Sequence, residues 1–480
     1  MSIPFQTITL QEILNNEQET KGRVPRVLDV NITSDLVDTC MPGDDLTLTG
    51  IIKVRGIDDS NSIKGNVATS LSLYMEAVTI IHNSNSNDKK CINTDTTLNE
   101  TNMKDYLAIK EIYDNKSNIF PLLVHSLCPG IYGYEMIKAG LLLSLLGGNG
   151  KGKGSRDQIH VLVVGDPGLG KSQMLQSCTR VSTKGVYICG NSSTSSGLTV
   201  TLTKETGTND FALEPGALVL ADGGCCCIDE FDKMSPQHHQ ALLESMEQQS
   251  VSVAKSGILC SLPSRTSILA AANPIGGRYD RGKTISQNLN ISQPLLSRFD
   301  LIFLLLDDPD QHRDRLICNH IMASHINPNG GTQSNAACED TSSRKSESRD
   351  NSLREKFTSL LTQTTGTIPQ IVLKKYISYA RQYVNPKLTA KAAEVLQKYY
   401  LELRSRNAEL SGSIPIYNRQ LEAMIRLTEA RAKLELRVEA TEFDALEIVE
   451  IMEYTIANML ENPFLKLPPS ISNNKFTEKK

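Results

Sequence analysis

The chain has 480 residues, of which 39% are hydrophobic, and this excludes global disorder and predicts about two to four domains with sizeable cores. Its formal net charge of −4 excludes nucleic-acid binding through a bulk positive field, so any such binding requires local basic elements. No apolar run approaches the ~20 residues of a membrane helix, and eleven cysteines without a C-x-x-C pair, together with the lack of an N-terminal signal peptide, indicate an intracellular, reducing compartment.

The first part of the chain, residues 1–82, is expected to be β-rich. Two stretches, VPRVLDVNI and DDLTLTGIIKVRGI, alternate apolar and polar residues, and the turn sequence MPGDD leads into the second. The segment 83–103 begins with a polar, asparagine-rich stretch, which predicts that it is an insertion loop. The sequences DYLAIKEIYD and GYEMIKAGLLLSLLGG then predict two helices, the second ending at a glycine pair.

Strands and helices alternate over residues 104–326. Buried strands of a largely parallel sheet are predicted for QIHVLVVG, GVYICG, ALVLADGGCCCID, TSILAAAN and DLIFLLLD. Residues 327–352 are rich in Ser, Asn and Gly and are expected to be a disordered linker. Residues 353–463 are expected to be helical, through LKKYISYARQY, TAKAAEVLQKYYLELRSR, YNRQLEAMIRLTEARAKLEL and EFDALEIVEIMEYTIANML, and residues 464–480 to be a loose tail.

A phosphate-binding loop is predicted in VLVVGDPGLGKSQML, which contains G-x-x-x-x-G-K-S between an expected strand and an expected helix. Glycines allow backbone N–H groups to surround phosphate at a helix N-terminus, where the helix dipole favours an anion. Lys171 is expected to bind the β- and γ-phosphates and the Ser172 hydroxyl to ligate Mg²⁺. An accidental glycine-rich turn is the alternative, which the flanking strand and helix disfavour. The expected ATP-binding residues are Gly165, Asp166, Pro167, Gly168, Gly170, Lys171, Ser172 and Gln173.

Three consecutive cysteines, Cys225 to Cys227, run into the carboxylates Asp229 and Glu230 in GGCCCIDEFDKM. A metal or redox site is one interpretation, but consecutive strand residues point to opposite faces, so three neighbours cannot converge on one ion. Packing is favoured, because buried cysteine behaves as a small hydrophobe. Asp229, at the end of the strand, is expected to hold Mg²⁺, and Glu230 to polarise the attacking water.

Four further residues are candidates, each with an ordinary alternative. Asn273 ends a strand and could orient water or contact the γ-phosphate, although Asn-Pro is also a turn signal. Arg298 precedes a strand and is a surface charge, an ion pair, or an arginine finger worth about 10³ to 10⁵ in rate. Arg419 opens a predicted helix in the C-terminal helical segment, and without the other motifs an ordinary helix-surface charge is favoured there. Lys255 lies at the tip of a predicted hairpin without bulky acids, which suits a nucleic-acid backbone, although such a lysine is more often only solvated.

In this order, GDPGLGKS, IDEFDKM, AAANP, LLSRFD and RQLEAMIRLTEA closely resemble the minichromosome-maintenance (MCM) DNA helicases, a branch of the AAA+ ATPases. The resemblance covers most of residues 1–82 and 115–460. It implies an α/β fold, with an AAA+ P-loop ATPase core over residues 104–326, a C-terminal helical lid over 353–463, and a partial, β-rich OB-fold segment over 1–82. Gly170 before Lys171, with GVYICGNSSTSSGLTVTLTKETG, looks most like the eighth paralogue, which is linked to homologous recombination and crosslink repair. The ninth paralogue is the nearest rival.

The resemblance also implies roles for the candidate residues. Lys171 and Ser172 would serve phosphate and Mg²⁺, with Asp229 as the acidic metal residue. The other implied roles are catalytic base for Glu230, first sensor for Asn273, arginine finger in trans for Arg298, second sensor for Arg419 and single-stranded DNA contact for Lys255. Active sites of this family form between subunits, so a homo- or hetero-hexamer with MCM paralogues, the ninth among them, is implied.

The implied function is an ATP-dependent DNA helicase subunit that couples ATP hydrolysis to translocation on single-stranded DNA and duplex unwinding. The implied setting is homologous recombination and DNA repair in the nucleus, with ATP and Mg²⁺ as cofactors, single-stranded and forked DNA as partners, and no membrane. The alternatives are a replicative helicase subunit, an ATP-binding DNA scaffold with little turnover, and a protein remodeller. Upstream zinc-binding cysteine pairs and a C-terminal winged helix are not found, so a partial gene product or a shortened family member is expected.

Overall fold

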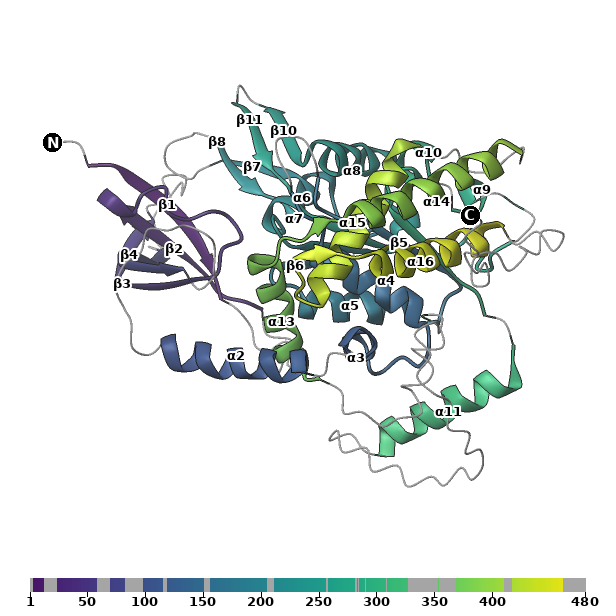
Figure 1. The fold of residues 1–480 in the computed structure, drawn as a ribbon. Helices are drawn as coiled ribbons and strands as arrows, with labels where there is room; N and C mark the ends of the chain where they lie inside the picture. Colours follow the sequence, from purple (N-terminus) through teal and green to yellow (C-terminus); the bar gives the residue numbers. More distant parts are fainter. Residues whose placement is uncertain are drawn as a thin grey trace. The chain divides into compact units, whose positions relative to one another are not determined.

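The computed structural model describes most of the chain in two units, residues 1–93 and 94–480 (Figure 1). The described residues are 3–12, 24–57, 70–82, 98–114, 119–150, 156–204, 211–255, 258–280, 283, 285–289, 291–307, 309–326, 353, 368–409 and 417–460. The predicted linker at 327–352, the tail at 464–480 and most of the insertion at 83–103 lie outside these ranges. The domain boundaries given above therefore stay predictions.

The first unit is a four-stranded sheet in the order β1-β2-β4-β3. Its strands are β1 (Phe5–Gln11), β2 (Val27–Thr33), β3 (Leu46–Ile57) and β4 (Ser70–His82). Alternation places Val30 and Ile32 with Met75 in a small buried core. At a register shift in β3, Gly50 lies so close to β4 that a Cβ there would be 2.2 Å from the Glu76 carbonyl oxygen. This unit confirms the predicted β-rich segment.

The second unit is built on a five-stranded parallel sheet in the order β13-β5-β12-β9-β6. The strands are β5 (Val161–Gly165), β6 (Gly185–Cys189), β9 (Cys225–Asp229), β12 (Ser267–Ala272) and β13 (Leu301–Leu305). Each lies within one of the five sequences predicted as strands, so the α/β class is confirmed. β6 is only half-buried, contrary to the prediction, because it lies at the end of this sheet order and pairs with β9 alone.

The prediction that ALVL belongs to a strand is wrong. Ala217–Leu220 form a short helix, α7, in which the Leu220 N–H donates to the Gly216 carbonyl at 3.0 Å. Four apolar residues fit a buried strand and a buried helical turn equally well, so periodicity cannot separate the two. The strand begins only at Cys225, after the turn at Gly223 and Gly224.

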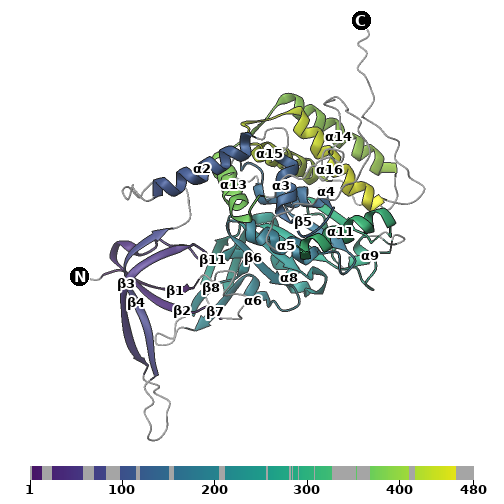
Figure 2. The same ribbon diagram turned by 90° about the horizontal axis from the view of Figure 1, so that it is seen from below.

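Helices cover both faces of the parallel sheet (Figures 1 and 2). On one face α5 (Lys171–Val181) packs on β9, β6 and β12, and α4 (Glu135–Leu146) packs on β5 and β12. The other face contacts an apolar cluster that includes Phe231 and Leu242, the latter from α8 (Pro236–Gln248). Further described helices are α3 (Ile119–Leu127), α6 (Ser195–Leu198), α9 (Ile285–Leu289), α10 (Gln293–Leu296) and α11 (Gln311–Ile326). Helix α2 (Leu98–Asp114) begins inside the stretch predicted as an insertion loop, because its first turn, LNET, carries no helix-breaking glycine or proline.

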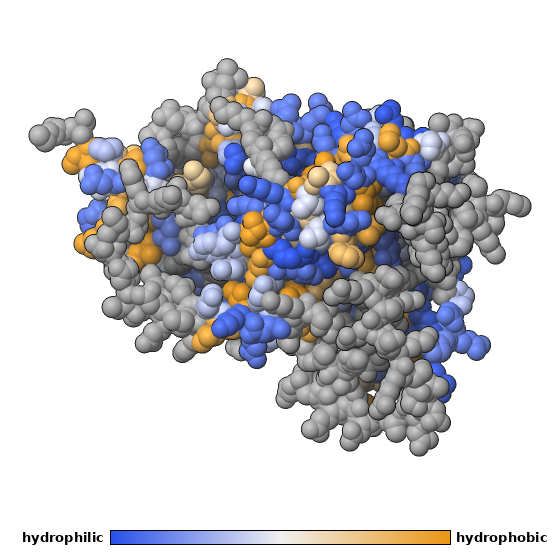
Figure 3. All heavy atoms as spheres, viewed as in Figure 1, coloured by the Kyte–Doolittle hydropathy of each residue, from blue (hydrophilic) through white to orange (hydrophobic). Residues whose placement is uncertain are grey.

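Four C-terminal helices pack onto this core and confirm the predicted helical segment. They are α13 (Gln370–Tyr383), α14 (Ala390–Glu409), α15 (Asn418–Leu434) and α16 (Glu442–Leu460). One apolar cluster contains residues of these helices and of the sheet, such as Leu427 and Phe303. In the space-filling view hydrophilic and hydrophobic residues are interspersed on the face that carries them (Figure 3). No helix within the described ranges is long and apolar enough to span a bilayer.

The triple cysteine lies in β9 and serves packing, as predicted. Cys225 and Cys227 contribute to the apolar cluster on one face of the sheet and Cys226 to the cluster on the other. All three side chains are at most 1% exposed. Among the described residues, no group of three or more His, Cys, Asp or Glu side chains is arranged to hold a metal ion.

Replacing Cys226 with alanine is expected to lower the free energy of unfolding by about 1 kcal/mol, because it leaves a small cavity in the core. The rate of ATP hydrolysis should stay within about twofold of the unsubstituted protein, since the side chain points away from the strand end. Chemical denaturation and an ATPase assay on the same preparation measure both quantities. A large loss of turnover with unchanged stability would contradict the packing role.

Candidate active site

Three adjacent strands deliver the predicted catalytic groups to one edge of the sheet. β12 lies between β5 and β9, with Ala272 paired with Val164 and Ala270 paired with Ile228. Since these strands are parallel, their carboxyl ends meet at the same edge. The phosphate loop, the acidic pair and Asn273 follow those three strand ends. The sequence predicted these groups as neighbours, and the topology places them together.

The loop between β5 and α5 depends on its glycines. Gly168 and Gly170 have φ angles of +89° and +81°, which side chains with a Cβ rarely adopt. Gly170 is the N-cap of α5, so the first free N–H groups of this helix face the loop. A Cβ on Gly165 would lie 2.4 Å from the Leu305 carbonyl oxygen on β13. The loop therefore forms an N–H-lined turn at a helix N-terminus, which suits phosphate.

Lys171 is buried within this loop, with only 7% of its surface exposed. Its Nζ donates to the carbonyl oxygens of Gly165 and Asp166 at 2.7 and 2.6 Å. Burial lowers the pKa of Lys171, while the nearby charges of Asp166, Asp229 and Asp232 act to raise it. The ammonium group thus has two neutral acceptors and several acidic neighbours, and a phosphate oxygen would be a stronger partner than either carbonyl.

Asp229 is held in place by two hydrogen bonds. Its Oδ2 accepts from the Tyr187 hydroxyl at 2.8 Å and its Oδ1 from the Glu230 N–H at 2.8 Å. Burial, followed by the hydrogen bond to Asp229, raises the pKa of Tyr187. Tyr187 could not be selected from the sequence, because it lies on β6, 42 residues away from Asp229.

Glu230 has an unusual backbone conformation. Its φ and ψ angles are 51° and 45°, the left-handed region, which costs a non-glycine residue on the order of 1 kcal/mol. Its carboxylate accepts from Lys233 Nζ at 3.0 Å and lies 3.5 Å from the Cys189 thiol. The kink follows the strand directly, so Glu230 leaves the direction of β9 at the edge where the phosphate loop lies. Strain of this kind is commonly found at functional sites.

Asp232 is a residue that the sequence prediction missed. Its Oδ1 accepts from the backbone N–H of Asn273 at 3.0 Å, which joins the loop after β9 to the end of β12. It is also one of the acidic groups that act on Lys171. The signal was present in IDEFDKM, where a third acid follows the predicted pair within three residues.

Oxygen donors at this edge suit Mg²⁺. Ser172 is the second residue of α5, after Lys171, and Asp229 is the last residue of β9. Nucleotide-bound Mg²⁺ takes only one or two protein ligands and completes its shell with water and phosphate, so a cluster of three acids is not required. These two residues fit the predicted metal role.

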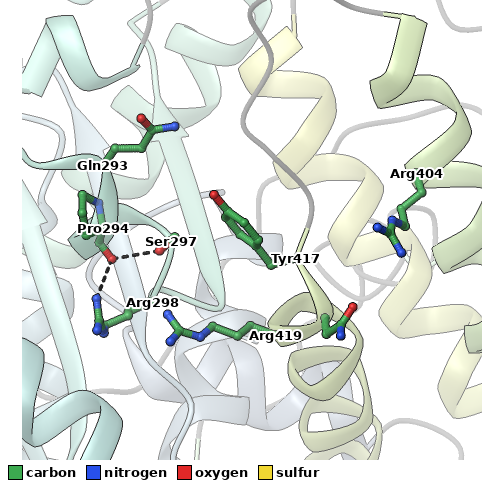
Figure 4. A pocket seen from close by; sticks show the side chains of 8 residues that line it. Gln293, Pro294, Ser297, Arg298, Arg404, Tyr417 and Arg419 are labelled. Carbon is green, nitrogen blue, oxygen red and sulfur yellow. Dashed lines mark hydrogen bonds between the residues drawn. The ribbon is translucent and has the colours of Figure 1, made fainter.

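Arg298 and Arg419 form a separate group. Arg298 Nη1 donates to the Pro294 carbonyl at 3.0 Å and its Nη2 to Glu247, while Arg419 Nη2 donates to the same carboxylate at 2.7 Å. Within the described residues, neither arginine bonds to the phosphate loop. Both line a pocket of about 640 Å³ together with residues of α10, α14 and the start of α15 (Figure 4). The pocket residues are Gln293, Pro294, Ser297, Arg298, Arg404, Tyr417, Asn418 and Arg419.

A buried ion-pair network is centred on Asp300, two residues after Arg298. The Asp300 carboxylate accepts from Arg156 at 2.6 Å and from Arg426 of α15 at 2.8 Å, and also from the His160 N–H at 3.0 Å. Burial alone would raise the pKa of Asp300, but the charges of Arg156 and Arg426 outweigh it and hold this pKa below its usual value. The network fixes α15, and with it Arg419, to the sheet.

His160 supplies a pH-dependent contribution to stability. Burial, and then the charge of Arg156, lowers its pKa from 6.5 to about 3. Its Nδ1 accepts from the Ile268 N–H at 3.1 Å, which requires the neutral ring. Between these two pKa values the unfolded chain binds a proton that the folded chain does not. Stability is therefore present above about pH 6.5 and is lost as the pH falls toward 3.

Replacing His160 with glutamine, which keeps an acceptor, is expected to reduce the slope of unfolding free energy against pH by about 1.4 kcal/mol per pH unit between pH 6 and 4. Urea unfolding followed by circular dichroism across this range measures the slope. The matched control is His325→Gln, because His325 is exposed on α11. Equal slopes for the His160 variant and the unsubstituted chain would contradict the buried neutral state.

Lys255 closes the first strand of the predicted hairpin. β10 (Ser250–Lys255) pairs antiparallel with β11 (Ile258–Pro263), and Lys255 is opposite Ile258 in the last pair of this register. A second hairpin, β7 (Val200–Lys204) with β8 (Phe211–Pro215), shares a small apolar cluster with it through Val200 and Val253 (Figures 1 and 2). The two hairpins therefore form one projecting β-element.

Comparison with known proteins gives matches along most of the chain. Three family models match, described as the MCM OB domain over residues 1–56, the MCM P-loop domain over 105–325 and the MCM AAA-lid domain over 371–456. Curated relatives include DNA helicase MCM8 of Homo sapiens and of Xenopus tropicalis, both 48% identical over 97% of this chain, and Probable DNA helicase MCM8 of Arabidopsis thaliana, 44% identical over 96%. The chain spans 56%, 56% and 60% of the length of these relatives. The predicted resemblance, to the family and to its eighth paralogue, is confirmed.

Proposed function

This chain belongs to the MCM family, and from that premise we propose that it is an ATP-dependent DNA helicase subunit. It couples ATP hydrolysis to translocation on single-stranded DNA and to duplex unwinding, with ATP and Mg²⁺ as cofactors. One observation carries the proposal: the phosphate loop, the Asp229–Glu230 pair and Asn273 follow three adjacent parallel strands, whereas Arg298 and Arg419 are grouped elsewhere. That division suits a site completed by a second subunit.

Each residue of the site has a chemical task in this proposal. Glu230 accepts the proton of the attacking water, and Asn273 orients that water from the adjacent strand end. Lys171 offsets the charge that develops on the phosphates. Ser172 and Asp229 would hold Mg²⁺, which would supply positive charge to offset that of the phosphates. Arg298 and Arg419 of the neighbouring subunit complete the stabilisation, so hydrolysis requires an assembled ring.

The proposed setting is homologous recombination and DNA repair in the nucleus, and it rests on the resemblance to the eighth paralogue. The proposed assembly is a hexamer of this chain alone or with other paralogues, the ninth among them. A replicative role shares the same site chemistry. A scaffold that binds ATP with little turnover is disfavoured, because Glu230 and Arg298 are both present. A protein remodeller is disfavoured, because SVSVAKSG has no aromatic residue for a pore loop.

An ATPase assay with and without single-stranded DNA, combined with mass measurement in solution, tests this proposal. We expect hydrolysis only in the assembled form and an increase in rate when single-stranded DNA is added. The same chain should show no such increase with an unfolded polypeptide. Hydrolysis by a monomer, or a rate that responds to polypeptide and not to DNA, would contradict it.

Replacing Lys255 with alanine is expected to weaken binding of single-stranded DNA and to reduce the slope of log Kd against log salt by about 0.7, the value for one phosphate contact. Fluorescence anisotropy with a labelled oligonucleotide across a salt series measures the slope. Lys391→Ala, which removes an exposed lysine of α14, is the matched control. Identical curves for the Lys255 variant and the control would count against a DNA contact at the hairpin.

A further inference from the structure

The carboxylate of Glu247 links the two arginines of the pocket. Glu247 lies near the end of α8, Arg298 follows α10, and Arg419 opens α15. One carboxylate oxygen accepts from Arg419 Nη2 at 2.7 Å and the other from Arg298 Nη2. Figure 4 shows the two guanidinium groups next to each other among the side chains that line the pocket. The carboxylate therefore connects the sheet-bearing core with the helical segment 368–460 at this surface.

Two guanidinium groups on one carboxylate constrain each other. Like charges at this distance repel, and without an anion between them the two side chains would separate. The hydrogen bond from Arg298, together with the charges of both arginines, holds the pKa of Glu247 below its usual value, so it is ionised at neutral pH. Its two oxygens bind one arginine each, which fixes their relative position.

The two arginines differ in how much they depend on Glu247. The Arg298 side chain is only 14% exposed, and it has a second partner in the Pro294 carbonyl. The Arg419 side chain is 41% exposed, and among the described residues its bonding partner is Glu247. A guanidinium has five N–H donors, so both groups retain donors for a phosphate while bound to Glu247. Loss of the carboxylate should affect Arg419 most.

We propose that Glu247 is a positioning residue that aligns Arg298 and Arg419 as a pair for the phosphates of a neighbouring subunit's nucleotide. This role of Glu247 rests on the proposed function, because it requires an active site shared between two subunits. Glu247 does not touch the nucleotide itself. It sets the geometry of the two arginines, and because these come from the core and from α15, it also makes that geometry sensitive to the position of α15.

Steady-state kinetics of the full chain test the alignment. Glu247→Ala should lower kcat by about tenfold, since small misplacements of catalytic groups have effects of this size, with KM for ATP changed by less than about threefold. Glu247→Gln keeps an acceptor without the charge and should give an intermediate kcat. Glu394→Gln, an exposed carboxylate of α14, is the matched control. An unchanged or increased kcat in Glu247→Ala would overturn the proposal.

Mixing variants distinguishes positioning in trans from a general effect on folding. A Lys171→Ala subunit lacks a working phosphate loop but carries an aligned pair of arginines. A Glu247→Ala subunit has a working phosphate loop, but its two arginines are not aligned. Their mixture should hydrolyse ATP faster than the weighted mean of the two alone. Arg298→Ala mixed with Lys171→Ala is the reference. Rescue in the reference alone would overturn the role of Glu247 and leave the proposed function standing, while rescue in neither mixture would overturn both.

Discussion

Substitution of Lys171 by alanine is expected to reduce ATP hydrolysis by at least about 10² to 10³-fold, the usual effect of removing one preorganised group that stabilises transition-state charge. Lys171 is the cationic group of the phosphate loop, and its Nζ lies among the Gly165 carbonyl, the Asp166 carbonyl and three acidic side chains. Within the described loop and α5, no other lysine or arginine could supply this positive charge to the phosphates. A coupled-enzyme ATPase assay with single-stranded DNA present measures the loss.

The Lys171 variant should remain folded. Burial lowers the pKa of this ammonium in the free protein, so its removal relieves a desolvation cost and only two hydrogen bonds to neutral carbonyls are lost. Thermal unfolding should therefore differ little from that of the unsubstituted chain. Lys391→Ala, at an exposed position on α14, controls for loss of one positive charge. A folded Lys171→Ala protein that hydrolyses ATP at the full rate would refute the site assignment.

Substitution of Glu230 by glutamine is expected to lower turnover by about 10² to 10⁴-fold, the contribution of a general base, while nucleotide still binds. Glutamine has nearly the same shape and can adopt the same left-handed backbone at comparable cost, so the loop after β9 should persist. Loss of the charge removes the ion pair with Lys233, which is exposed and worth little to stability. Binding and hydrolysis should therefore separate in this variant.

Two measurements on the Glu230 variant establish that separation. Titration with a fluorescent ATP analogue should give a Kd within about threefold of the unsubstituted protein, and a single-turnover assay should show the slow chemical step. Cys226→Ala, four residues before Glu230 on the adjoining strand β9, is the natural comparison, because it should lose stability and keep turnover. Parallel loss of binding and hydrolysis in Glu230→Gln would argue for a structural role of the carboxylate.

The sequence was sufficient wherever the local structure depends on residues that are neighbours in the chain. The phosphate loop, the acid pair and the four C-terminal helices follow local patterns of glycine, charge and apolar periodicity, and the structure contains them where they were expected. The strand predicted for ALVL was wrong, because a run of four apolar residues shows neither a helical nor a strand periodicity. The start of α2 was misplaced for a similar reason, since a polar first turn resembles a loop.

Long-range partners could not be predicted in this way. Tyr187 reaches Asp229 across 42 residues, and Glu247 reaches Arg419 across 172. Neither pair has a spacing that a helix or strand period would select. The role of Glu247 becomes visible only when α8, the turn after α10 and the start of α15 meet at one pocket. The division of the site into two groups likewise needed the fold.

Strand displacement on a forked duplex tests the central claim most directly. The full chain, assembled as in the ATPase assay, is mixed with a fork carrying one labelled strand, in the presence of Mg²⁺ and with or without ATP. We expect the labelled strand to be released only with ATP, and not by the Lys171→Ala or Glu230→Gln variants at the same concentration. Hydrolysis of ATP without any strand release, or release by either variant at the rate of the unsubstituted chain, would contradict a helicase built on this site.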